Sequence, residues 1–168
     1  KMEKKECKEK EKDVTVLIPV YNSKKYIKET IASIKKQEYC GDIYINIIDD
    51  GSTDGSLELL KSMEKDSNIR IIESNHIGKA AALNKGLDCV TTDYTITVDS
   101  DTILHPLAIR NIMNKLVNSD KKTAATAGCL FVKNAKKSFV TKLQEWDYTL
   151  GIFGVKLTQG NYNSTLVA

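Results

Sequence analysis

Short runs of β-branched and aromatic residues alternate with segments of helical periodicity along most of this chain. Such residues favour a pleated backbone, and short apolar runs bounded by polar residues are typical of buried strands. They predict four strands, at Val14–Val20, Ile43–Ile48, Ile69–Ile72 and Tyr94–Val98. Because strands alternate with helices, we predict an α/β fold with a doubly wound, mostly parallel sheet and helices on both faces, similar to a Rossmann fold.

Apolar residues recur at helical spacing between these strands. The first predicted helix follows Ser23, which is suited to cap it, and ends near Gly41. The second begins near Ser56, where Asp54 or Thr53 can cap it, and an alanine-rich third helix opens at Gly78. Beyond the fourth strand we expect a helix from His105–Pro106, a strand over Thr123–Val132 and a helix over Phe139–Leu150.

The composition is that of an ordinary globular protein, with 168 residues of which 41% are hydrophobic. The net charge of +3 is too small to argue for a nucleic acid partner, although it suits an anionic ligand or a membrane surface. No run reaches the 18 or more apolar residues of a membrane-spanning helix. The stretch 1–13 is almost entirely charged, so we expect a solvated tail or linker there and a domain that begins at Val14.

Polar residues gather where three of the predicted strands end, at Pro19–Tyr21, Asp49–Asp50 and Asp99–Asp101. In open parallel sheets, ligands bind beyond the carboxyl ends of the strands. Asp99 and Asp101 are two residues apart, so they can share one face of an extended chain. Carboxylates so placed suit a hard cation such as Mg²⁺ bound together with substrate phosphates. The alternative is that both are turn residues that cap the next segment.

A nucleotide needs a surface for its base, partners for its polar edges and counter-charge for its phosphates. Tyr21 could stack on a base, or be a half-buried residue at a strand end. Asp50 could accept a hydrogen bond from a base or a ribose, or stabilise a turn. Lys79 stands at a helix start, where a cation is disfavoured unless a phosphate is near, or it is a solvated surface lysine.

Several familiar signatures are absent from the sequence. There is no G-x-G-x-x-G after the first strand and no G-x-x-x-x-G-K-[ST] loop, so a classical dinucleotide site and a P-loop NTPase are both unsupported. His76 and His105 are isolated in the sequence, and single histidines are more often structural than catalytic. No arrangement of Ser, His and Asp or of Cys and His follows from the spacing.

Four blocks of the sequence together resemble the ordered signature of family 2 glycosyltransferases of the GT-A fold: Val16–Asn22, Asp49–Asp54, Gly78–Gly86 and Asp99–Asp101. The resemblance implies that the turn Pro19, Val20, Tyr21 and Asn22, together with Asp50, holds the uracil and ribose of a UDP-sugar. It places Lys79 and Ser100 near the nucleotide. It makes Asp99 and Asp101 a D-x-D motif that binds Mn²⁺ or Mg²⁺, with Asp101 the principal ligand.

The segment Gln144–Tyr148 is similar to processive, membrane-embedded polysaccharide synthases such as those for poly-N-acetylglucosamine, hyaluronan and chitin. This implies an inverting transfer from a UDP-sugar to a saccharide or lipid-linked acceptor for cell-surface polysaccharide. It also implies a parent protein at the cytoplasmic face of the cell membrane, attached through parts not present here. We therefore expect a GT-A domain over 14–168, with a nucleotide-sugar half at about 14–105 and an acceptor half at about 106–168.

The sequence departs from the family at the general base. The family's short Glu-Asp or Thr-Glu-Asp motif does not occur before Ala168, and the Gln-x-x-Arg-Trp block of processive synthases is also absent. Glu145 and Asp147 are carboxylates in the half of the chain where the base is expected, but neither fits the motif. We expect a fragment truncated on the acceptor side, with its base beyond Ala168, that is inactive alone.

Other functions share parts of this pattern. A phosphatase of the haloacid dehalogenase type also uses D-x-D at a strand end, but its motif wants Thr or Val where Ile103 stands. A nucleotidyltransferase would need a loop rich in glycine and arginine after the first strand, and this chain has Val20–Lys25 there. A non-catalytic module that binds a nucleotide-sugar is the remaining alternative.

Overall fold

The computed structural model describes residues 10–64, 66–119, 123–128, 131 and 139–150. Its contacts divide the chain into two units, residues 1–117 and residues 118–168, which we describe separately. The predicted tail over residues 1–13 lies mostly outside the described residues. The predicted division of the domain near residue 105 stays a prediction.

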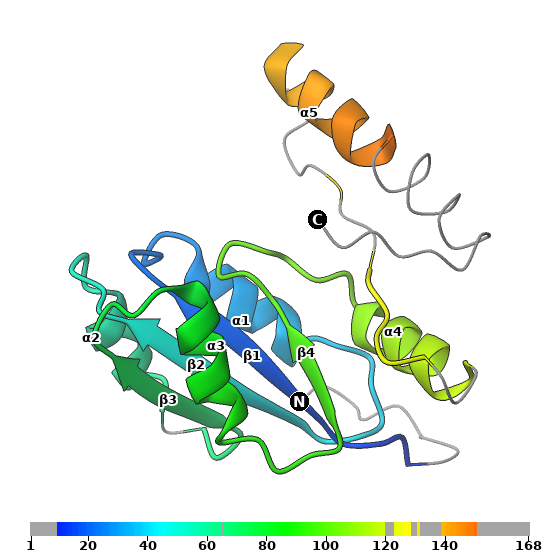
Figure 1. Cartoon of the computed structure of the whole chain (residues 1–168), viewed down its shortest axis with the longest axis horizontal. Coiled ribbons are helices and arrows are strands. Elements are labelled where there is room, and N and C mark those ends of the chain that lie inside the picture. Colours follow the sequence, from blue (N-terminus) through cyan, green and yellow to red (C-terminus); the bar gives the residue numbers. More distant parts are fainter. Residues whose placement is uncertain (1–9, 65, 120–122, 129–130, 132–138, 151–168) are drawn as a thin grey trace. The chain divides into compact units, whose positions relative to one another are not determined.

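The first unit contains a four-stranded parallel sheet in the order β3-β2-β1-β4 (Figure 1). Val14 at the start of β1 pairs with Ile43 of β2 and with Tyr94 of β4. The order reverses at β1, as in a doubly wound sheet, which confirms the predicted α/β class. The strands are β1 Val14–Val20, β2 Ile43–Asp50, β3 Ile69–Ser74 and β4 Tyr94–Thr97.

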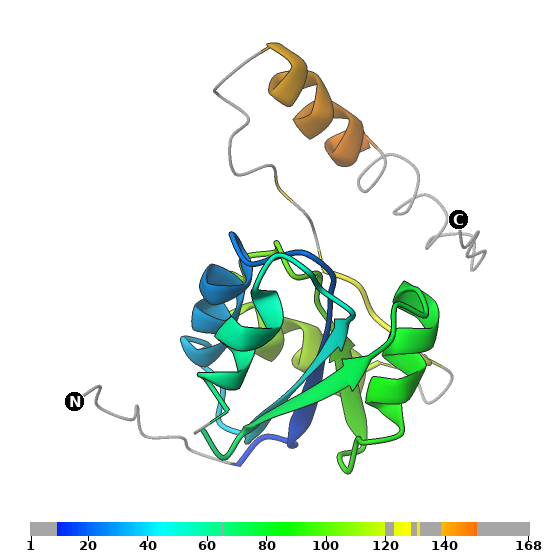
Figure 2. The same ribbon diagram turned by 90° about the vertical axis from the view of Figure 1, so that its left-hand side faces the viewer.

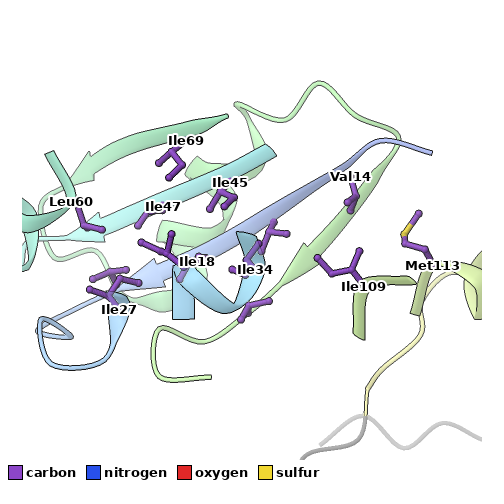
Figure 3. Packing of buried hydrophobic residues seen from close by; sticks show 14 residues of the cluster. Val14, Ile18, Ile27, Ile34, Ile45, Ile47, Leu60, Ile69, Ile109 and Met113 are labelled. Atoms are coloured by element: carbon purple, nitrogen blue, oxygen red, sulfur yellow. The ribbon is translucent and has the colours of Figure 1, made fainter. Parts of the chain in front are cut away.

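Helices cover both faces of this sheet (Figure 2). Alternate residues of β1 point to opposite faces, as a pleated strand requires. Leu17 packs on one face with Ala82, and Ile18 packs on the other with Ile27 and Ile47 (Figure 3). The four helices of this unit are α1 Ile27–Lys35, α2 Ser56–Lys61, α3 Lys79–Leu87 and α4 Ala108–Val117. Helix α3 packs on one face, and α1, α2 and α4 pack on the other.

Several predicted boundaries need correction. Strand β2 continues through Asp49 and Asp50, so both aspartates are buried at its end rather than lying in the following turn. Helix α1 begins at Ile27, and the Ser23 hydroxyl does not cap it but donates to the carbonyl oxygen of Tyr21 at 3.2 Å. Asp54 does accept a hydrogen bond from the backbone N–H of Ser56, at the start of α2.

Strand β4 was predicted to be buried, but Thr95 and Thr97 are exposed. Thr95 and Thr97 lie on the same face of the strand, so this face is open to solvent. Threonine favours strands because it is β-branched, but its polar hydroxyl also allows it to face water. Strand propensity therefore does not predict whether these threonines are buried.

The second unit differs from prediction in one element. Helix α5, Phe139–Thr149, confirms the predicted helix. The predicted strand over Thr123–Val132 is wrong for its described residues, since 123–128 and 131 belong to no strand. Residues 123–128 are rich in alanine and glycine, which are depleted in strands because they offer little side chain to pack. No helix among the described residues is long and apolar enough to cross a membrane.

Candidate functional site

A cleft of about 390 Å³ opens at the carboxyl ends of β1, β2 and β4. Its volume lies within the range of small-molecule sites. Every predicted site residue except Asn22 lines it, and His76 and Gly78 join them. The lining residues are Pro19, Val20, Tyr21, Asp50, His76, Gly78, Lys79, Asp99, Ser100 and Asp101. Parallel strands gather these residues because their carboxyl ends lie at one edge of the sheet.

Asp50 ties the loop before α3 to the end of β2. Its Oδ1 accepts a hydrogen bond from the backbone N–H of Ile77 at 2.8 Å, and its Oδ2 accepts one from Gly78 at 2.9 Å. Burial by itself would raise the pKa of Asp50, but these N–H donors favour the charged form and the pKa is lowered from its ordinary value. Each carboxylate oxygen retains capacity for a further donor.

His76 forms an aromatic pair with Tyr21 in the cleft. The two rings are stacked with their centroids 4.4 Å apart and an angle of 30° between their planes. The Nδ1 atom of His76 lies 3.3 Å from the backbone oxygen of Asp50. His76 is isolated in the sequence and was not among the predicted site residues. The position of His76 two residues before Gly78, where α3 opens, could have indicated a place near the site. Its contact with Tyr21 cannot be predicted from the spacing of residues in the sequence.

Lys79 and Asp99 form an ion pair across the cleft, with Nζ 2.6 Å from Oδ1. Lys79 is the first residue of α3, and Asp99 follows β4. Both side chains are exposed, and so is Asp101. A backbone hydrogen bond of 3.0 Å from Thr102 N–H to the Asp99 carbonyl closes the turn that carries both aspartates.

Asn22 does not line the cleft. Its side-chain Oδ1 accepts a hydrogen bond from the Thr53 backbone N–H at 2.8 Å, and its own backbone N–H donates to Ser52 Oγ at 3.0 Å. Asn22 therefore joins the turn after β1 to the loop after β2. The positive φ of 50° at Asn22 is a conformation that asparagine tolerates better than most residues.

The carboxylates of Asp99 and Asp101 suit a divalent cation only if a bound molecule supplies further ligands. Among the described residues, no group of three or more His, Cys, Asp or Glu side chains could hold a metal ion. Mg²⁺ characteristically binds through one or two carboxylates together with substrate phosphates. This donor set therefore fits a metal that arrives with a diphosphate.

Glu145 and Asp147 lie on α5 in the second unit.

The fold is that of a GT-A glycosyltransferase, and the chain belongs to glycosyl transferase family 2, whose sequence model matches residues 15–163. Among its relatives is the poly-beta-1,6-N-acetyl-D-glucosamine synthase of Staphylococcus aureus (strain COL). The two are 29% identical over 147 residues, which cover 87% of this chain and 35% of the synthase. The chain spans 15% to 39% of the length of four curated relatives that it matches.

Two examples represent the solved structures that share the fold. TarS 1-349 of S. aureus, in complex with UDP, matches with a TM-score of 0.56 and 25% identity, over 62% of this chain and 32% of that chain. The mannosyltransferase PcManGT of Pyrobaculum calidifontis, in complex with GDP-Man and Mn²⁺, matches with a TM-score of 0.60 and 27% identity. That match covers 64% of this chain and 33% of the mannosyltransferase.

Proposed function

We propose that the cleft binds a UDP-sugar and that this chain is the donor-binding part of a metal-dependent, inverting glycosyltransferase. The observation that carries the proposal is the order of groups along one sheet edge: an aromatic pair and Asp50 near β1 and β2, then Lys79 with Asp99 and Asp101 near β4. That order matches a base at one end of a ligand and a diphosphate at the other. The UDP complex of TarS supports this choice of nucleotide.

The aromatic and polar groups near β1 and β2 would receive the nucleoside. The half-exposed ring of Tyr21 offers a face on which uracil can stack, beside Pro19 and Val20. Asp50 would accept a hydrogen bond from the base or the ribose through the capacity its carboxylate retains. Asn22 would contribute indirectly, by holding the turn that carries Tyr21.

Asp99 and Asp101 would hold Mn²⁺ or Mg²⁺ together with the diphosphate, with Ser100 between them. Such an ion acts as a Lewis acid that stabilises the charge on the departing diphosphate. Lys79 would turn from Asp99 to a phosphate oxygen, since its long side chain is exposed and can reorient. The PcManGT complex, which contains Mn²⁺ with its nucleotide-sugar, supports a divalent ion here.

Transfer also needs an acceptor and a base. The acceptor would be a saccharide or a lipid-linked acceptor of a cell-surface polysaccharide, at the cytoplasmic face of the membrane. The polysaccharide named as the product of the synthase relative supports a saccharide acceptor. A general base, which we expect to be a carboxylate, must take the proton of its hydroxyl. The three carboxylates that line the cleft already have other roles in this proposal, so we expect this chain to bind its donor and to transfer sugar slowly by itself.

Calorimetric titration with UDP, GDP and ADP, each with Mn²⁺ and again with EDTA, tests the proposal. We expect UDP to bind most tightly and its affinity to fall in EDTA. Equal affinities for the three nucleotides would contradict the uridine assignment. UDP binding that is unchanged by EDTA would separate Asp99 and Asp101 from the nucleotide and would favour a non-catalytic binding module.

A further inference from the structure

One side of α1 carries polar residues whose side chains bind the backbone of the loop between β4 and α4. Thr30 and Ser33 are one helical turn apart, and Gln37 follows one turn later, just beyond the end of the helix. Residues at this spacing lie on the same side of a helix. The loop that they contact carries Asp99 and Asp101 at its start and leads into α4.

The contacts follow the loop in order. Thr30 Oγ1 donates to the Ser100 carbonyl at 2.8 Å, and Ser33 Oγ accepts from the Leu104 backbone N–H at 3.0 Å. The amide of Gln37 then donates to the His105 carbonyl at 2.8 Å. Its oxygen accepts from the backbone N–H of Ile109, the second residue of α4, at 2.9 Å.

Ser100, between the two aspartates, is held twice. Thr30 binds its carbonyl, and the hydroxyl of Ser23 lies 2.7 Å from its hydroxyl. Thr30 is fully buried, with 0% of its surface exposed, so it cannot touch a ligand in the cleft. The hydrogen bond of its hydroxyl connects Thr30 to the cleft through Ser100. Because the backbone of Ser100 sets the directions of both neighbouring residues, it also sets the geometry of the two carboxylates.

We propose that Thr30, with Ser33 and Gln37, is a positioning residue that holds the Asp99–Asp101 turn in the geometry required for metal and diphosphate. This inference rests on the proposed function of the cleft. A site that binds charge gains from groups fixed in place before the ligand arrives, because less ordering remains for the binding step. The buried hydroxyl side of α1 supplies that fixation, and the same helix buries Ile27, Ile31 and Ile34 in the core.

The test uses a buried hydroxyl elsewhere as a matched control. Thr15 is 2% exposed, and its hydroxyl lies 2.8 Å from that of Thr92, near the start of β1 and away from the cleft. Thr30→Val and Thr15→Val each remove one buried hydroxyl. We expect Thr30→Val to weaken UDP binding with Mn²⁺ by roughly three- to tenfold, as loss of one hydrogen bond implies. Binding in EDTA should change by less than about twofold.

Thr30→Ser keeps the hydroxyl and should bind UDP with Mn²⁺ as the wild type does, as should Thr15→Val. A wild-type affinity for Thr30→Val, or an equal loss in Thr15→Val, would overturn the positioning role. Amide hydrogen exchange over residues 100–104 provides a readout that needs no nucleotide. Exchange there should be faster in Thr30→Val than in Thr15→Val, and equal rates would also overturn the inference.

The two proposals fail in different ways. If the wild-type chain binds no UDP with Mn²⁺, the proposed function fails, while hydrogen exchange still reports whether Thr30 orders the turn. If the wild type binds UDP and Thr30→Val binds it equally well, the function stands and the positioning role is wrong.

Discussion

Lys79 Nζ lies 2.6 Å from Asp99 Oδ1, so the lysine at the start of α3 pairs with the first carboxylate of the Asp-Ser-Asp turn. The side chains are 62% and 58% exposed, and a pair this exposed contributes little to stability. Under the proposed function, each partner has a second use: Asp99 for a cation and Lys79 for a phosphate. Binding of a metal and a diphosphate would therefore break this ion pair and form two new contacts, one between Asp99 and the metal and one between Lys79 and a phosphate.

Lys79→Met should change two affinities in opposite directions. Without nucleotide, Mn²⁺ should bind more tightly, because no lysine competes for Asp99. UDP with Mn²⁺ should bind roughly tenfold or more weakly, since a charged hydrogen bond is lost. Electron paramagnetic resonance of free Mn²⁺ and calorimetry measure the two. Lys61→Met is the control, because Lys61 forms an exposed pair with Glu73 at 2.7 Å. If Lys79→Met lowers both affinities, Lys79 does not compete with Mn²⁺ for Asp99.

Asp101→Ala should abolish metal-dependent UDP binding and leave the melting temperature unchanged. Asp101 is exposed, so its removal leaves no cavity and no buried partner. In a transfer assay, the loss of one charge-stabilising contact would cost on the order of 3 kcal/mol in the transition state. Asp93→Ala, at an exposed aspartate just before β4, should leave binding intact. If Asp101→Ala lowers the melting temperature instead, Asp101 acts as a turn residue.

Asp50→Asn should destabilise the chain in a pH-dependent manner. The folded state lowers the pKa of Asp50, so the carboxylate stabilises the fold above its ordinary pKa of about 4. That contribution is lost as the pH falls through the lowered value. At pH 7 we expect a cost of about 1–3 kcal/mol, because an amide cannot accept from both Ile77 and Gly78. Urea unfolding from pH 7 to pH 3 measures it. If the free energies of unfolding of the wild type and Asp50→Asn differ by a constant amount across that range, the charged carboxylate is not the source of the stability.

Gly86→Ala should destabilise the chain although alanine favours helices. An added Cβ would lie 2.6 Å from Cδ1 of Ile48 and 2.8 Å from its Cγ1. Overpacking of this kind typically costs about 1–3 kcal/mol. Ile48→Val removes Cδ1, so the double variant should be more stable than the sum of the two single changes predicts. Urea denaturation of all four proteins tests this, and simple additivity would show that the two residues do not conflict.

The sequence determined the strands and their order in the chain, because apolar periodicity is a local property. Val14–Val20 has the same bounds as predicted, and α3 opens at Gly78 as expected. The strand expected over Thr123–Val132 shows the limit of this reasoning. The sequence was interpreted as a strand there, but the alanines and the glycine of residues 123–128 provide too little side-chain surface for strand packing.

The sequence also placed nine residues in a candidate site, and eight of them line one cleft because parallel strands end at one edge. How these residues are used depends on contacts that form only in the folded chain. In the folded chain Asn22 accepts a hydrogen bond from Thr53, and His76 stacks on Tyr21. Thr30 donates a hydrogen bond to the carbonyl of Ser100. Local periodicity follows from bonded geometry, whereas the partner of a polar side chain depends on which distant segments the folded sheet brings within about 3 Å.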